Sequence, residues 1–266
     1  MNPDVSWTSV IGRVSFANCD PLFDGLPKEW SILPAPPSWL TSHLLARDCI
    51  VAPIPSADLC QHSESLVALR GLGIASRGSV GSVLLFGSRR IELMRDIAVP
   101  SDSSTSRTLL PWLLNNRGLE PRIIEMGPDL TSMLERCDGA LLIGDRALHE
   151  SSEHPELVRL DLGTDWLEAT GTPMVFGVFA ARRDSPLTCV KMARRDLLST
   201  LCMFEEEPNH RSAVIRRSAD RVGFDEDRMR RYFDTEVRNR LNDHDESGLE
   251  QFAEQVCGGS TIHWVD

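Results

Sequence analysis

Short runs of apolar residues recur between residues 10 and 180, and most of them are bounded by Gly, Pro, Asn, Asp or Ser. Apolar runs of roughly 4–8 residues with turn residues on either side predict strands. One run, at 49–55, is almost continuously apolar, which is typical of a parallel sheet covered on both faces. The predicted strands are Val10–Phe16, Trp30–Leu33, Cys49–Pro55, Leu66–Leu69, Gly73–Ser76, Val83–Phe86, Ile97–Val99, Arg122–Met126, Gly139–Ile143 and Met174–Ala180.

Apolar residues at helical spacing follow several of these strands. They predict helices that begin near Pro37, Leu109 and Leu130, and after Pro186 the whole pattern is helical. The strands form two groups, and the second begins near Arg95. Strands that alternate with helices in this way are typical of α/β proteins.

The two groups of strands predict two α/β lobes joined by crossovers, with a ligand cleft between them. We expect residues 1–90 plus 183–266 to form the first lobe with the C-terminal helices, and residues 91–182 to form the second lobe. The crossovers are expected near residues 89–96 and 181–186.

A loop rich in hydroxyl groups follows the strand at 97–99. Side chains of this kind cap helix N-termini, where backbone N–H groups lack partners and the helix dipole is positive. Two interpretations stay open: the hydroxyls only cap the helix, or they also bind a carboxylate or phosphate. The hydroxyl side chains are Ser103, Ser104, Thr105 and Ser106.

Three other polar segments follow predicted strands, where ligands bind in open α/β sheets. Asn18 is either a turn residue or a ligand contact. The turn at 78–82 either connects two strands or lines the cleft together with Ser76 and Ser82, since glycine lets a backbone approach a ligand closely. Asp145 either caps the next helix or faces the cleft.

The net charge and the hydropathy of the chain exclude some classes of binding partner. The net charge of −11 and the pI near 5.1 argue against a nucleic-acid-binding surface. No apolar run approaches the roughly 18 residues of a membrane span, and Met1–Asp4 has no signal-peptide character. We expect a cytoplasmic protein, monomeric or homodimeric, with a small-molecule ligand and neither nucleic-acid nor membrane partners.

Cysteines and histidines give no metal-binding pattern. The seven cysteines are scattered and contain no C-x-x-C pair, as expected for buried thiols in a reducing compartment. His149 and His154 are five residues apart and do not form H-E-x-x-H. The sequence therefore predicts neither a metal site nor a cofactor.

A series of short motifs spans most of residues 10–182. The segments are Gly12–Asn18 with Pro21-Leu22, Ile74–Ser76 with Gly78, Val80 and Ser82–Leu85, Thr105-Ser106, Leu142–Leu148, Asp161–Gly163 with Trp166, and Thr170-Gly171 with Pro173. In their order and spacing, these motifs resemble the chorismate dehydratases of the futalosine pathway of menaquinone biosynthesis.

The resemblance implies a two-lobed periplasmic-binding-protein type II fold and a hydro-lyase. Such an enzyme removes water from chorismate, a dicarboxylate, to give 3-[(1-carboxyvinyl)oxy]benzoate. We expect Asn18 to be catalytic, with the enolpyruvyl carboxylate of the substrate as the base, and Asp145 to fix the loop. The expected substrate-binding residues are Ser76, Ser82, Ser103, Thr105, Ser106 and Asp145.

Two other functions stay open. An enzyme resembling 1,4-dihydroxy-6-naphthoate synthase of the same pathway has the same fold and would need a cleft histidine, for which His149 is the candidate. A non-enzymatic solute-binding protein for a small carboxylate is the third reading. Incubation with chorismate separates the three.

Overall fold

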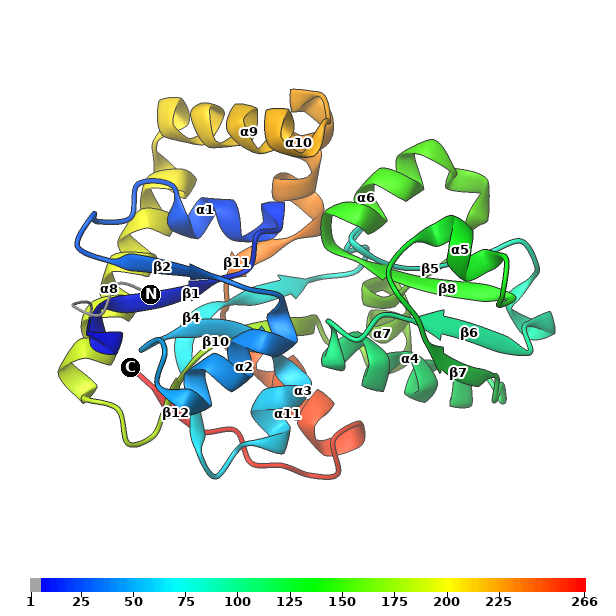
Figure 1. Ribbon diagram of the computed structural model, residues 1–266, viewed down its shortest axis with the longest axis horizontal. Coiled ribbons are helices and arrows are strands. Elements are labelled where there is room, and N and C mark those ends of the chain that lie inside the picture. The colour runs from blue at the N-terminus through cyan, green and yellow to red at the C-terminus, as the bar shows by residue number, and fades with distance from the viewer. Residues whose placement is uncertain (1–5) are drawn as a thin grey trace.

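Two five-stranded sheets lie side by side along the longest axis of the protein, with helices on their faces (Figure 1). The computed structural model describes residues 6–266. Residues 1–4, on which the expected lack of a signal peptide rests, lie outside the described residues. Within 6–266, no helix is long and apolar enough to cross a membrane.

Every strand predicted from the sequence overlaps a strand of the structure, and two predicted runs are the two ends of the long strand β4. The short strands β9, β11 and β12 were not predicted. The strands are β1 Val10–Arg13, β2 Ser31–Pro34, β3 Ala52–Pro55, β4 Leu66–Ser76, β5 Val83–Gly87, β6 Asp96–Val99, β7 Arg122–Glu125, β8 Gly139–Ile143, β9 Val158–Asp161, β10 Met174–Arg182, β11 Arg238–Arg240 and β12 Trp264–Val265.

Helices connect and cover these strands, and the chain after β10 is mostly helical, as predicted. A π-helix, Tyr232–Glu236, follows α10. The α-helices are α1 Asp20–Phe23, α2 Pro37–Ala46, α3 Ser56–Gln61, α4 Ser104–Asn115, α5 Leu130–Leu134, α6 Gly144–Glu153, α7 Leu162–Thr170, α8 Leu187–Glu206, α9 Pro208–Val222, α10 Glu226–Arg231 and α11 Asp243–Gln255.

The first sheet has the strand order β11-β4-β10-β3, with β12 paired to β4, and the second has the order β7-β6-β8-β5-β9. The strands β1 and β2 form a parallel pair beside β3. The run predicted to lie in a parallel sheet has one parallel neighbour, because Val51 bridges Ile11 of β1, but β3 itself pairs antiparallel with β10. An apolar run shows that both faces are covered, but its direction depends on a partner far along the chain.

The strand pairing also changes the boundaries expected for the two lobes. Strand β5 pairs with β8 and β9 in the second sheet, whereas β10 pairs with β3 and β4 in the first. We therefore propose that the second lobe lies between Ser76 and Met174, and that the crossovers are the segments 77–82 and 171–173. The sequence places strands, but sheet membership depends on long-range hydrogen bonds.

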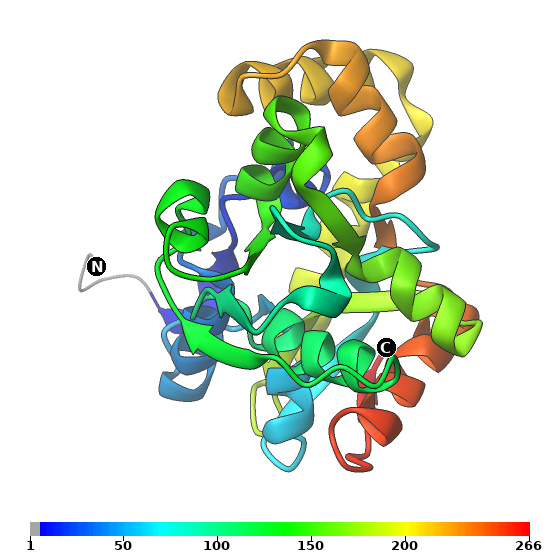
Figure 2. The same ribbon diagram turned by 90° about the vertical axis from the view of Figure 1, so that its right-hand side faces the viewer.

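The C-terminal segment reaches both sheets. Figure 2 shows the orange chain around α10 above the green helices of the second sheet, and the red helix α11 on the opposite side. Helix α1 packs against α8 and α9, while Phe252 of α11 contacts Trp166 of α7 with ring centroids 6.0 Å apart. The space between the sheets is thus bordered by residues from all parts of the chain.

Candidate active site

A cavity that opens to solvent lies between the two sheets. The walls come from loops that follow β1, β4, β6 and β8, from the start of α2, and from β3, β4 and β10. The lining residues are Val14, Phe16, Asn18, Pro37, Pro53, Ile54, Pro55, Ile74, Val80, Ser82, Val83, Ser103, Ser106, Ile143, Gly144, Phe176 and Gly177.

The polar side chains of the lining are one amide and three hydroxyls. They belong to Asn18, Ser82, Ser103 and Ser106, all four of which the sequence predicted as site residues. None of the lining side chains carries a titratable group. The cavity wall can therefore donate and accept hydrogen bonds, but its own side chains provide neither a proton acceptor of ordinary basicity nor a cation.

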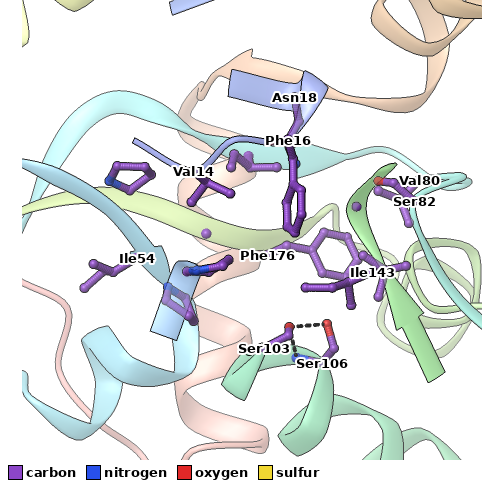
Figure 3. Close-up of a pocket in the computed structure, with 17 residues that line it drawn as sticks. Val14, Phe16, Asn18, Ile54, Val80, Ser82, Ser103, Ser106, Ile143 and Phe176 are labelled. Atoms are coloured by element: carbon purple, nitrogen blue, oxygen red, sulfur yellow. Dashed lines mark hydrogen bonds between the residues drawn. The ribbon is translucent and has the colours of Figure 1, made fainter. Parts of the chain in front are cut away.

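Two phenylalanine rings occupy the middle of the cavity wall. Figure 3 shows Phe16 and Phe176 between Asn18 at the top of the view and Ser106 at the bottom. The Phe16 ring packs against the apolar clusters of both sheets. Aromatic faces of this kind suit a flat, partly apolar ligand ring.

Asn18 lies in the 3-10 turn Ala17–Cys19 that follows β1. Its backbone carbonyl accepts a hydrogen bond of 2.8 Å from Nδ2 of Asn239, which also donates to the carbonyl of Gly73. The Asn18 side chain is 8% exposed, and its Oδ1 has no hydrogen-bond partner within residues 6–266. Because buried polar atoms are normally paired, this atom indicates a ligand that donates a hydrogen bond.

Ser82 is held by a tyrosine from the C-terminal part of the chain. Its Oγ accepts a hydrogen bond of 3.0 Å from the hydroxyl of Tyr232, and its carbonyl accepts one of 2.7 Å from the N–H of Gly144. Burial raises the pKa of Tyr232, so this phenol remains protonated and can donate. The tyrosine thereby holds the Ser82 side chain at the cavity wall.

Ser103 and Ser106 interact at the start of α4. The Oγ of Ser103 accepts a hydrogen bond from the Ser106 N–H at 3.4 Å and donates one to the Ser106 Oγ at 2.8 Å (Figure 3). Ser103 is thus the N-cap of α4, which is one of the two roles left open for these hydroxyls. The same two hydroxyls also line the cavity, next to the positive end of the helix dipole.

Two other predicted contacts lie outside the cavity lining. Ser76 donates to the carbonyl of Gly78 at 3.0 Å, and Thr105 accepts a hydrogen bond of 3.1 Å from the Ala57 N–H at the start of α3. Hydroxyl groups bind a backbone group wherever one is within reach, and the sequence does not show which one is near. Ser76 bonds within its own turn and Thr105 joins α4 to α3, and neither residue is among those lining the cavity.

Asp145 is likewise outside the lining and does not cap α6. Its Oδ1 accepts a hydrogen bond from the Ala17 N–H at 2.9 Å, and its Oδ2 accepts one from Nη1 of Arg221 at 3.2 Å. Burial raises the pKa of Asp145, while the Ala17 N–H and Arg221 act in the opposite direction. The carboxylate therefore contacts the loop that carries Asn18, and its direct contact with the ligand stays a prediction.

The turn before Ser82 is occupied by a carboxylate of the protein. Asp161 accepts hydrogen bonds from the N–H groups of Val80 and Gly81, at 3.0 and 2.8 Å, and from the Ser79 hydroxyl at 2.9 Å. These two amides are therefore not available to a ligand carboxylate. The sequence contained a signal for this, because Asp161 opens one of the matching motifs.

Four residues around the site were not predicted: Asn239, Tyr232, Arg221 and Phe176. The first three come from the C-terminal helical part of the chain, more than 70 residues in sequence from the groups they contact. Phe176 was predicted only as a strand residue. Nothing in the local sequence distinguishes these side chains from ordinary surface or core residues.

The two α/β units and the cavity between them define a protein of the periplasmic-binding-protein fold. A solved protein of Archaeoglobus fulgidus matches with a TM-score of 0.71 and 20% identity, over 92% of this chain and 95% of that chain. The periplasmic aliphatic sulphonate binding protein SsuA of Escherichia coli matches with a TM-score of 0.64 and 15% identity, over 97% and 93%. The predicted fold class is confirmed.

Sequence comparison identifies the family. A family model described as menaquinone biosynthesis matches residues 9–257. The chorismate dehydratase of Thermus thermophilus is 32% identical over 93% of this chain and 94% of that protein. The chain belongs to this menaquinone biosynthesis family, as the motifs predicted.

Proposed function

We propose that the protein is a chorismate dehydratase, an enzyme that removes water from chorismate to form 3-[(1-carboxyvinyl)oxy]benzoate. Family membership and the Thermus thermophilus relative support this proposal. The observation that carries it is the cavity wall, which combines an unpaired amide oxygen on Asn18 with hydroxyls and has no titratable side chain. Such a wall fits a substrate that supplies its own base.

The elimination breaks one C–H bond and one C–O bond of the ring. The enolpyruvyl carboxylate of chorismate takes the proton from the ring carbon that bears the ether, and hydroxide leaves from the neighbouring carbon. The carboxylic acid so formed gives its proton to the leaving hydroxide, so that water departs and the carboxylate is regenerated. The reaction is redox-neutral overall, and aromatisation provides the driving force.

Asn18 fits the leaving group. Dianionic chorismate has a single O–H donor, its ring hydroxyl, and the unpaired Oδ1 of Asn18 is an acceptor at the cavity wall. The amide NH₂ of the same side chain can donate to the enolpyruvyl carboxylate and hold it against the ring proton. Asn18 therefore positions both reacting groups.

The substrate carboxylates are matched to the two serine groups. We assign Ser106, with Ser103 behind it at the N-terminus of α4, to one carboxylate and Ser82 to the other. Hydrogen bonds to a charged group are worth about 1.5–3 kcal/mol, so a few well-placed hydroxyls can replace a cation. The rings of Phe16 and Phe176 then flank the substrate ring.

The alternative enzyme function is disfavoured by the position of the candidate histidine. His149 lies in α6 with its ring centroid 6.4 Å from that of Phe224, and it is not among the cavity-lining residues. The cavity lining contains no histidine. A naphthoate synthase-like reaction that needs a cleft histidine would lack it here.

Incubation of the purified protein with chorismate tests the proposal. We expect 3-[(1-carboxyvinyl)oxy]benzoate to accumulate in proportion to enzyme, which chromatography with absorbance detection will show. A binding protein would leave chorismate unchanged but bind it in calorimetry. Recovery of unreacted chorismate at high enzyme concentration contradicts the proposed activity.

Gly144 offers a test of the cavity shape. It lines the cavity with a φ of +63°, and a Cβ added there would lie 2.7–2.8 Å from atoms of the Phe16 ring. Replacement by alanine must displace this ring and strain the backbone by roughly 1–2 kcal/mol. We expect Gly144→Ala to weaken binding of 3-[(1-carboxyvinyl)oxy]benzoate by about tenfold or more in calorimetry.

Gly171 provides the matched control, because it has a φ of +76° and open space where a Cβ would be. Gly171→Ala carries the same kind of backbone strain but lies outside the cavity lining. It should lower the midpoint of thermal unfolding and leave the dissociation constant at its wild-type value. Equal affinities of the two variants would show that Phe16 does not shape the ligand site.

A further inference from the structure

Two serine hydroxyls at the cavity wall accept a hydrogen bond from another hydroxyl behind them. Ser82 Oγ accepts from Tyr232 at 3.0 Å, and Ser106 Oγ accepts from Ser103 at 2.8 Å. A hydroxyl has one proton to donate. A serine that is held as an acceptor in this way keeps its own proton for a third group, and both serines line the cavity.

In each of these two hydroxyl pairs, the hydroxyl behind the wall, Ser103 or Tyr232, is the hydrogen-bond donor. Ser103 accepts from the Ser106 N–H, so its own proton is directed to the Ser106 hydroxyl. Tyr232 is 1% exposed, and Ser82 is the one hydrogen-bond partner of its hydroxyl within residues 6–266. Because burial keeps the phenol protonated, it donates to Ser82 throughout the neutral pH range.

The tyrosine ring is held firmly in place. Tyr232 begins the π-helix at 232–236, and irregular helical turns of this type occur frequently at functional sites. Its ring centroid lies 5.5 Å from that of Phe233 and 6.0 Å from the guanidinium carbon of Arg228. The hydroxyl therefore has little freedom to turn away from Ser82.

We infer that Tyr232 is a positioning residue that holds the Ser82 hydroxyl as a hydrogen-bond donor to a carboxylate of the ligand, as Ser103 does for Ser106. The identity of the ligand rests on the proposed function. The arrangement explains how a wall without cationic side chains binds a dianion, because each serine proton is directed before the ligand arrives and costs little to order on binding. Deletion of the tyrosine hydroxyl leaves Ser82 in place but frees its proton to point elsewhere.

Calorimetry with 3-[(1-carboxyvinyl)oxy]benzoate tests this inference. We expect Tyr232→Phe to raise the dissociation constant about three- to tenfold, in line with the loss of one supporting hydrogen bond. Ser82→Ala should raise it further. Because the tyrosine acts through the serine, the double variant should bind the product as weakly as Ser82→Ala alone. The inference is overturned if Tyr232→Phe binds with wild-type affinity. It is also overturned if the two losses of affinity add in the double variant.

Thr200→Val is the matched control. Thr200 is 1% exposed, and its hydroxyl donates to the Asp196 carbonyl within α8, away from the cavity lining. Its removal deletes one buried hydroxyl of similar stabilising value. We expect it to lower the unfolding free energy as Tyr232→Phe does while leaving the dissociation constant unchanged; a matching loss of affinity would assign the Tyr232 effect to general destabilisation.

A spectroscopic measurement tests the inference without the Tyr232→Phe variant, so its result does not depend on whether that variant folds. Tyr232 is the single tyrosine of the chain, so protein labelled with 13C at the tyrosine Cζ gives one resonance. We expect this resonance to shift when wild-type protein is saturated with the product, and to stay in place in Ser82→Ala at saturation. An unshifted wild-type resonance overturns the inference, whereas wild-type protein that neither binds the product nor converts chorismate overturns the proposed function as well.

Discussion

Replacing Asn18 by alanine is expected to lower kcat for chorismate by about 100- to 1,000-fold, while the dissociation constant of 3-[(1-carboxyvinyl)oxy]benzoate rises by a much smaller factor. The magnitude is that of losing the alignment of the reacting groups, since a misplacement of about 1 Å can cost roughly 100-fold in rate. Asn18 acts on the leaving hydroxyl, which the product lacks. Its loss therefore affects the transition state more than the bound product.

The preorganisation of Asn18 is visible in its backbone contacts. Asn239 holds its carbonyl from one side, and Asp145 holds the preceding N–H of Ala17 from the other. The side chain itself has an unpaired buried Oδ1, so the protein has kept a hydrogen-bonding group free at the cavity.

Steady-state and single-turnover kinetics check the expectation, since they separate chemistry from product release. Asn18→Asp is the informative companion variant, because it keeps the shape but places a carboxylate beside a dianion. We expect it to lose turnover like the alanine variant and, unlike it, to bind the product much more weakly at neutral pH. Wild-type kcat in Asn18→Ala contradicts the proposed mechanism.

Asp145→Asn is expected to lower kcat by about 10- to 100-fold although this residue does not line the cavity. Its carboxylate joins the Ala17 N–H to Arg221, and Arg221 also donates to the Ser15 carbonyl at 2.8 Å and to Asp20 at 2.8 Å. All these bonds converge on the loop that carries Asn18. A catalytic group displaced by about 1 Å can cost roughly 100-fold in rate.

The stability of this variant should be close to that of the wild type. Because burial raises the pKa of Asp145 above its ordinary value, its contribution to stability is fully present below that ordinary value and declines as the pH rises through the folded-state pKa. Removing the charge at neutral pH therefore gives up little stability. Urea unfolding at pH 7 should show a difference within about 1 kcal/mol.

Asp184→Asn serves as the control for loss of an ion-paired aspartate. Asp184 pairs with Arg182 and Arg47 at the surface, outside the cavity lining. It should leave kcat unchanged. If Asp145→Asn also keeps wild-type kcat, the bridge to Ala17 is structural only and does not position Asn18.

The sequence was sufficient to predict every strand except β9, β11 and β12, the fold class, and the four polar side chains that line the cavity. Local apolar patterns report burial, and Asn18, Ser82, Ser103 and Ser106 each follow a strand at the sheet edge where ligands bind. The order of short motifs predicted the family before any comparison. These properties depend on neighbouring residues, so they are readable along the chain.

Contacts between distant segments required the folded chain. The strand direction of β3, the membership of β5 and β10 in their sheets, and the supporting bonds from Tyr232, Arg221 and Asn239 all join residues far apart in sequence. Ser76 and Thr105 have the residue types of ligand contacts but bind nearby backbone groups. A hydroxyl or carboxylate takes whichever partner packing brings within about 3 Å, and residue type alone does not name that partner.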